Sequence, residues 1–184
     1  ALSKLRSISI MSHPPKHRLP IVTQVDEESD EIIMTALERE IHRGGQAYIL
    51  YNDVSTMHLF YERMQQLCPQ ISFAMIHGQM PISAIETQMA RFYSQSFQVL
   101  IASTIIESGI DIPHANTIIV TRADRLGLAQ LHQLRGRVGR SHHQAYAYLL
   151  TPKGSELSEK TALRLSAVDN HTQLGSGFQL AVAD

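Results

Sequence analysis

Short apolar runs alternate with helical patterns along most of this 184-residue chain. Runs such as Ala47–Tyr51 and Phe97–Ala102 contain no charged residue, which is typical of strands that are buried on both faces of a sheet. Because strands that alternate with helices predict βαβ units, we expect an α/β fold with a mainly parallel sheet. The expected strands are 19–25, 47–51, 71–76, 97–102, 117–120 and 145–150, and the expected helices are 30–43, 55–67, 81–95, 128–137 and 156–168.

The first helix has clear boundary signals. Either Ser29 or Asp30 can cap its N-terminus, because both side chains accept hydrogen bonds from free backbone N–H groups. The pair Gly44-Gly45 would end it. The residues expected to form its buried stripe are Ile33, Leu37 and Ile41.

Composition limits the classes of function. Apolar residues make up 43% and charged residues 18%, as in soluble globular proteins. The net charge is −1, so a nucleic-acid partner would have to be met by a local patch. The single cysteine, Cys68, excludes an internal disulfide and zinc sites built from several thiolates, and we expect it to pack in the core. Without a membrane-length apolar run or a signal-peptide pattern, we expect no membrane partner and a cytoplasmic location.

Polar residues follow three of the expected strands. Asn52-Asp53 follows the strand 47–51, His77-Gly78 follows 71–76, and Ser103-Thr104 follows 97–102. Because the carboxyl ends of parallel strands share one edge of a sheet, we expect these corners to form one surface. Free backbone N–H groups at such corners can hold anions. Taken singly, each corner is a weak signal, and His77 has no partner at metal-ligand spacing, so we expect no metal site.

The segment that follows Ser103-Thr104 ends in Gly109-Ile-Asp111-Ile-Pro113. In open parallel sheets, ligands bind beyond the carboxyl ends of the strands. A carboxylate such as that of Asp111 can hold a ribose hydroxyl there. Read alone, the segment is as well explained by a turn with a capping aspartate.

The segment Gln130–Arg140 carries the strongest chemical signal. In a helix, Gln133, Arg137 and Arg140 would lie on one stripe, at i, i+4 and i+7. Gly136 and Gly139 each cost a helix up to about 1 kcal/mol, which favours a close backbone approach or a helix end. Guanidinium groups beside glycines suit phosphate oxygens and can stabilise charge on a transferring phosphoryl group. A basic helix C-terminus or a general phosphate patch remains the alternative.

An acidic stretch, Asp26–Asp30, follows the first expected strand and imitates a magnesium-binding box. Only 25 residues precede it, which leaves no room for a phosphate-binding P-loop domain, and the sequence contains no P-loop motif. We therefore expect these acids to be surface and helix-start charges.

Together these segments resemble the second RecA-like domain of superfamily 2 helicases and translocases. His77–Met80 is similar to motif IVa, Ser103–Pro113 to motif V and Gln130–Arg140 to motif VI, whose pattern Gln-x-x-Gly-Arg-x-Gly-Arg is complete here. The match extends over the whole chain to the transcription-repair coupling factors. The related RecG branch-migration helicases share the motif layout but are less similar at Tyr51–Asp53 and Ser141–Gln144.

The resemblance implies a RecA-like three-layer fold that belongs to an ATP-driven double-stranded DNA translocase. Such an enzyme displaces stalled RNA polymerase and recruits nucleotide excision repair. Arg137 and Arg140 would be arginine fingers, with Gln133 near the γ-phosphate. Gly109, Asp111 and Gly136 would face the nucleotide, which is ATP with Mg²⁺ shared with a first RecA-like domain absent from this chain. The residues implied to hold the DNA backbone are Asn52, His77, Gly78, Ser103 and Thr104.

The resemblance also implies a domain organisation. Residues 1–20 would be an irregular leading segment, 21–150 the RecA-like domain, and 151–184 a C-terminal helical extension that starts the family's coupling motif. The chain would be half of a motor, with RNA polymerase and excision-repair protein bound by other domains of the parent. A RecG-like branch-migration domain and a non-catalytic RecA-like nucleic-acid-binding module are the alternatives.

Overall fold

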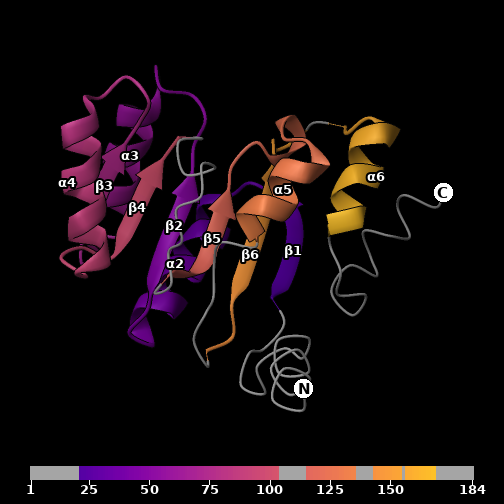
Figure 1. Ribbon diagram of the computed structural model, residues 1–184. Helices are drawn as coiled ribbons and strands as arrows, with labels where there is room; N and C mark the ends of the chain where they lie inside the picture. Colours follow the sequence, from indigo (N-terminus) through magenta and orange to yellow (C-terminus); the bar gives the residue numbers. More distant parts are fainter. Residues whose placement is uncertain (1–20, 104–114, 136–142, 155, 169–184) are drawn as a thin grey trace, which may run out of the picture.

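Six parallel strands form the centre of the molecule, in the order β1-β6-β5-β2-β4-β3 (Figure 1). The computed structural model describes residues 21–103, 115–135, 143–154 and 156–168. All strand pairs in this sheet are parallel, which confirms the expected α/β class. The strands are β1 (Val22–Glu27), β2 (Gln46–Leu50), β3 (Phe73–Ile76), β4 (Val99–Ala102), β5 (Ala115–Val120) and β6 (Tyr146–Thr151).

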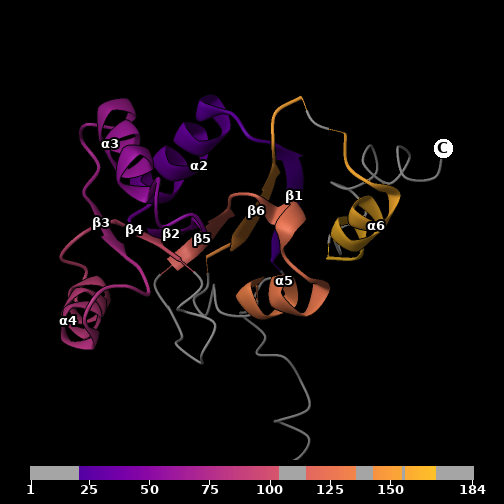
Figure 2. The same ribbon diagram turned by 90° about the horizontal axis from the view of Figure 1, so that it is seen from above.

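Helices cover both faces of the sheet, so the fold has three layers. Seen from above, α2 and α3 lie on one face and α4 and α5 on the other, with α6 beside β1 (Figure 2). A short 3₁₀ helix, η2, which the sequence pattern did not predict, links β5 to α5. The helices are α2 (Asp30–His42), α3 (Met57–Leu67), α4 (Ile82–Tyr93), η2 (Ala123–Arg125), α5 (Leu128–Arg135) and α6 (Glu159–Val168).

The central strands are buried on both faces, as their uninterrupted apolar sequences predict. Every residue of β2, β4 and β5 is buried. Alternate side chains enter two separate cores, so Tyr48 and Leu50 pack in one while Ala47 and Ile49 pack in the other. Cys68 is buried in the second core, as expected, and burial raises the pKa of its thiol.

The first helix begins where Ser29 caps it. The Ser29 Oγ accepts a hydrogen bond from the Ile32 N–H at 3.1 Å, which decides between the two expected caps. The helix ends just before Gly44, whose φ of +84° favours glycine. The expected stripe packs on the second core, where Ile33 and Leu37 are buried and Ile41 is partly buried; Glu40, which the pattern did not predict, is buried as well.

Glu40 is a buried carboxylate that joins α2 to the sheet. Its side chain is fully buried. It accepts hydrogen bonds from the Arg43 guanidinium at 2.7 and 2.8 Å and from the Thr117 hydroxyl at 2.5 Å. Arg43 also donates to the Gln144 carbonyl at 2.6 Å, just before β6, and its bond to Glu40 raises the pKa of the guanidinium. A buried carboxylate needs such partners, because an unpaired buried charge is very costly.

None of the helices in the described segments combines the length and apolar character that a membrane span requires.

Gly45→Ala should destabilise the protein by about 1–3 kcal/mol, because a side chain there overfills a packed site. A Cβ at Gly45 would lie 2.1 Å from Glu40 Oε2, which Arg43 Nε holds in place, while Thr117 holds the other oxygen of the same carboxylate. In a Glu40→Ala background, the nearest remaining atom is the Asn116 side-chain nitrogen at 3.4 Å, so the same substitution should cost little. Denaturant unfolding of the two single variants and the double variant measures this coupling. An equal cost in both backgrounds would contradict it.

Candidate functional site

The polar corners expected from the sequence lie together at the carboxyl edge of the sheet. Strands β3, β4 and β2 are neighbours, and their last residues, Ile76, Ala102 and Leu50, are in register. The residues that follow them, His77, Ser103 and Asn52, therefore share one edge. The geometric part of the prediction is confirmed for these three corners.

The His77 corner is a tight turn that leads into α4. The Met80 N–H donates to the His77 carbonyl at 3.1 Å, and the Gln79 N–H donates to His77 Nδ1 at 3.2 Å. Gly78 is exposed. Pro81, with φ −58° and ψ 144°, is the last non-helical residue before α4. The turn therefore offers an exposed backbone beside a half-buried imidazole.

The other two corners differ in how much surface they offer. Ser103 is only 6% exposed, and its carbonyl accepts a hydrogen bond from the Tyr48 hydroxyl at 3.4 Å. Asn52 and Asp53 are exposed. The Asp53 carboxylate accepts hydrogen bonds from the Ser55 hydroxyl at 2.5 Å and the Ser55 N–H at 3.1 Å, and these lower its pKa. Asn52 and His77 are thus better placed than Ser103 to meet a ligand.

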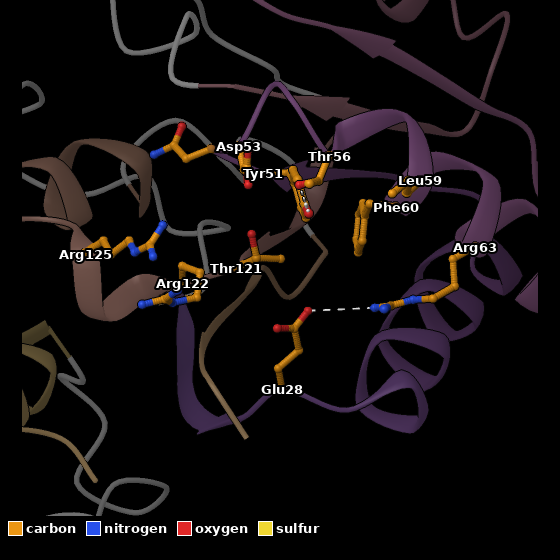
Figure 3. A pocket seen from close by; sticks show the side chains of 11 residues that line it. Glu28, Tyr51, Asp53, Thr56, Leu59, Phe60, Arg63, Thr121, Arg122 and Arg125 are labelled. Atoms are coloured by element: carbon orange, nitrogen blue, oxygen red, sulfur yellow. Dashed lines mark hydrogen bonds and ion pairs between the residues drawn. The ribbon is translucent and has the colours of Figure 1, made fainter. Parts of the chain in front are cut away.

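A pocket of about 460 Å³ opens beside Asn52 (Figure 3). Arg122 and Arg125 approach it from the end of β5 and Arg63 from α3, while Glu28 lies between these two sides. Of its lining residues, sequence reasoning had singled out Asn52 as a binding residue. Thr121 and Arg122 also line it and directly follow the carboxyl end of β5, so their place after a strand is the sequence signal that indicates them. The lining residues are Glu28, Tyr51, Asn52, Asp53, Thr56, Leu59, Phe60, Arg63, Thr121, Arg122 and Arg125.

Arg122 adopts an unusual backbone conformation at this pocket. Its φ of 51° and ψ of 47° are left-handed, which is uncommon for a residue other than glycine. The preceding Thr121 hydroxyl donates to the Leu50 carbonyl at 2.8 Å, and the Arg125 N–H donates to the Arg122 carbonyl at 3.0 Å. Strained residues of this kind persist where their surroundings hold them, and they cluster at functional sites.

The Arg122 side chain is fixed by a neighbouring carboxylate. Its Nε and Nη2 donate to the two oxygens of Asp124 at 3.1 and 2.9 Å, and this pairing lowers the pKa of Asp124. Arg164 of α6 donates to the Asp124 carbonyl. The final described helix is therefore bonded directly to the turn that presents Arg122.

Glu28 departs from its expected role. Asp26 and Glu27 are exposed at the end of β1, as predicted for surface charges. Glu28 instead lines the pocket, and burial raises the pKa of its carboxyl against the opposing effect of Arg63, which lies 4.0 Å away. The prediction that Asp26–Asp30 are surface and helix-start charges is therefore wrong for Glu28, because its carboxyl is partly buried in this pocket.

Of the residues predicted to meet the nucleotide, the structure describes Gln133. Gln133 is exposed on α5. Thr104, Gly109, Asp111, Gly136, Arg137 and Arg140 lie outside the described residues. Within the described segments, no group of three or more His, Cys, Asp or Glu residues could hold a metal ion.

Residues 28–142 match the model of the helicase conserved C-terminal domain. The chain belongs to this family. It is 51% identical over all 184 residues to the transcription-repair-coupling factors of Haemophilus influenzae and Escherichia coli, and 44% identical over 180 residues to that of Staphylococcus aureus. It spans 15–16% of the length of these relatives. The resemblance inferred from the motifs is confirmed.

Solved structures place the helicase C-terminal domain in the RecA-like fold. The structure of RecG bound to a three-way DNA junction matches with a TM-score of 0.72 and 29% identity, over 91% of this chain and 22% of RecG. The C-terminal domain of the DEAD-box protein Dbp5 matches with a TM-score of 0.60 and 18% identity, over 82% of this chain and 84% of that domain. The second match shows the fold alone.

Glu28→Gln should raise the thermal midpoint at neutral pH, and this gain should shrink as the pH falls. The pKa of Glu28 lies above its ordinary value of 4.5, so the folded state binds this proton more tightly than the unfolded state. Ionised Glu28 therefore weakens the fold above its folded-state pKa, and the penalty disappears below about 4.5. Thermal unfolding across this range of pH measures the effect.

The matched control is Glu27→Gln, because Glu27 is exposed one residue earlier. It should leave the thermal midpoint unchanged at every pH. A Glu28→Gln variant that is less stable than the wild type at neutral pH would show that the attraction of Arg63 and Arg122 outweighs burial.

Proposed function

We propose that this helicase C-terminal domain is the second RecA-like half of an ATP-dependent double-stranded DNA translocase. In this proposal the parent protein displaces stalled RNA polymerase and couples transcription to nucleotide excision repair. The observation that carries the proposal is the 51% identity over the whole chain to two proteins named transcription-repair-coupling factor. The polar carboxyl edge of the sheet supports it, because nucleic-acid backbones are bound by such polar and backbone donors.

The DNA-binding residues of the proposal are those of the carboxyl edge. Exposed Asn52 and Gly78 and half-buried His77 would contact the sugar-phosphate backbone, joined by Ser103 and Thr104. Contacts of this kind position a duplex without reading its sequence. A translocase needs this property, because it must advance along DNA of any sequence.

ATP with Mg²⁺ would be held between this domain and a first RecA-like domain. Hydrolysis of its terminal phosphate bond would drive the motor. The exposed position of Gln133 on α5 fits a residue that meets a ligand from outside this domain. Arg137 and Arg140 would stabilise negative charge that develops on the transferred group. Gly109, Asp111 and Gly136 would face the ribose and phosphates. The P-loop would come from the first domain, because this sequence contains none.

The domain organisation is part of the proposal. Residues 1–20 would lead into the RecA-like domain 21–150, and 151–184 would begin the coupling motif. The bond between Arg164 of α6 and the Asp124 carbonyl supports a coupling role, because it joins this segment to the carboxyl edge. RNA polymerase and the excision-repair protein would bind other domains of the parent, which we propose to be cytoplasmic.

A RecG-like branch-migration helicase is the second candidate. The match to RecG, with a TM-score of 0.72, favours it over a non-catalytic module of the same fold. The two candidates differ in substrate. Release of a stalled transcription complex by the full-length protein would support the first, and regression of a model replication fork without such release would support the second.

Arg137→Ala and Arg140→Ala should each cripple ATP hydrolysis by the full-length protein while sparing DNA binding. An arginine finger acts on transition-state charge, and its contribution is roughly 10³–10⁵ in rate. Lysine should rescue poorly, because a point charge cannot replace a planar fork. The measurement is the ATPase rate as a function of DNA concentration. Full recovery of turnover at saturating DNA would instead make these arginines DNA contacts.

The 184-residue chain alone should not hydrolyse ATP. It contains no phosphate-cradling loop, and in motors of this kind catalysis needs groups from both domains. Its DNA binding should be weak and independent of sequence, since half of a split groove neutralises few phosphates. Turnover by the purified chain that is lost in Arg137→Ala would contradict this prediction.

A further inference from the structure

The carboxyl edge continues past Asn52 to the end of β5. In the sheet order, β5 is the next strand after β2, and its last residues are in register with those of β2. Neighbouring strands lie about 4.8 Å apart, so the edge from β3 to β5 extends for about 14 Å. Arg122 and Arg125 stand at its β5 end, on the pocket that Asn52 also lines.

The arginines of this pocket differ in whether their N–H donors are already bonded to a carboxylate, although Arg125, like Arg122, also acts through its charge on nearby Asp124. Arg63 forms an ion pair with Asp30 at 3.2 Å, and Arg122 is bonded to Asp124 through two nitrogens. The Arg125 guanidinium forms no hydrogen bond or ion pair with any described residue, and the residue is exposed. Arg125 is therefore the guanidinium in this pocket that is available for a ligand.

Two carboxylates also line the pocket and limit what can bind. Glu28 lies between the two sides and pairs with Arg63, while Asp53 is held by Ser55 and lies nearer the arginines that follow β5 (Figure 3). A ligand with several negative charges, such as a free nucleotide, would meet both carboxylates, and only the Arg125 guanidinium has donors that no described residue engages. A phosphodiester carries a single charge, which matches one guanidinium and the neighbouring Asn52 amide.

We propose that Arg125, together with Asn52, binds a backbone phosphate of DNA and extends the proposed DNA-binding edge onto β5. This inference rests on the proposed function and adds to it a residue outside the helicase motifs identified in the sequence. Arg122 is the positioning residue, because its left-handed backbone and its bonds to Asp124 fix the turn from which Arg125 projects.

The test uses the full-length protein and a short duplex of mixed sequence, with affinity measured over a range of salt concentrations. Arg125→Ala should weaken binding equally for unrelated sequences and reduce the slope of log K against log salt by about 0.9, the value for one phosphate contact. Arg125→Lys keeps the charge and should retain most of the slope, which separates charge from any effect on folding.

The matched control is Arg91→Ala. Arg91 is an exposed arginine in the last turn of α4, bonded to Gln88 and lying over the Phe97 ring near the opposite edge of the sheet. The Arg91→Ala substitution removes the same charge from the protein as Arg125→Ala and should leave the slope of log K against log salt unchanged. An Arg125→Ala slope equal to that of the wild type, or equal losses in Arg91→Ala and Arg125→Ala, would overturn the proposal.

Failure of the proposed function would be visible separately. It would appear as a wild-type protein whose ATP hydrolysis is not stimulated by DNA. The salt slope of duplex binding does not depend on ATP hydrolysis, so the comparison of the Arg125 and Arg91 variants would still decide the phosphate contact.

Discussion

The parallel pairing of all six strands is the constraint on which the rest of the structure depends. It brings the residues that follow β3, β4, β2 and β5 to one edge, although they are widely separated in the sequence. Strands β2, β3 and β4 can then be almost wholly apolar, because helices cover both faces. Polar chemistry is left for the strand ends, where His77, Asn52 and Arg122 emerge.

The two edges of this sheet serve different purposes. At the amino edge, buried polar groups are satisfied internally: Glu40 by Arg43 and Thr117, and the Gln46 amide by the Phe92 and Phe97 carbonyls at 2.9 and 2.8 Å. Such networks fix a unique packing when complete. The carboxyl edge has exposed corners and a left-handed Arg122, so its polar groups are available to a ligand while the opposite edge maintains the fold.

The strands and their shared carboxyl edge could be predicted from the sequence, because they depend on local residue patterns. The pocket could not, because it depends on the order of the strands in the sheet. Apolar runs without a charged residue, such as 47–51 and 97–102, are typical of buried strands, and a parallel sheet then implies the shared edge. The pocket could not be foreseen, because Glu28, Arg63 and Arg122 meet only when β1, α3 and β5 are placed beside one another. The burial of Glu40 was not predicted for a related reason. A glutamate is buried only where partners satisfy its carboxylate, and one of them, Thr117, is far from Glu40 in the sequence.

Asp124 joins two segments that are far apart in the sequence, the turn after β5 and helix α6. This residue binds the Arg122 guanidinium through its carboxylate and the Arg164 guanidinium through its carbonyl. A shift of α6 would therefore displace the turn that carries Arg122 and Arg125, because Arg164 is bonded to the backbone of that turn. The left-handed conformation of Arg122 leaves the turn few other conformations. A helix beyond the last strand thus has a direct mechanical route to the edge proposed to hold DNA, without passing through the core.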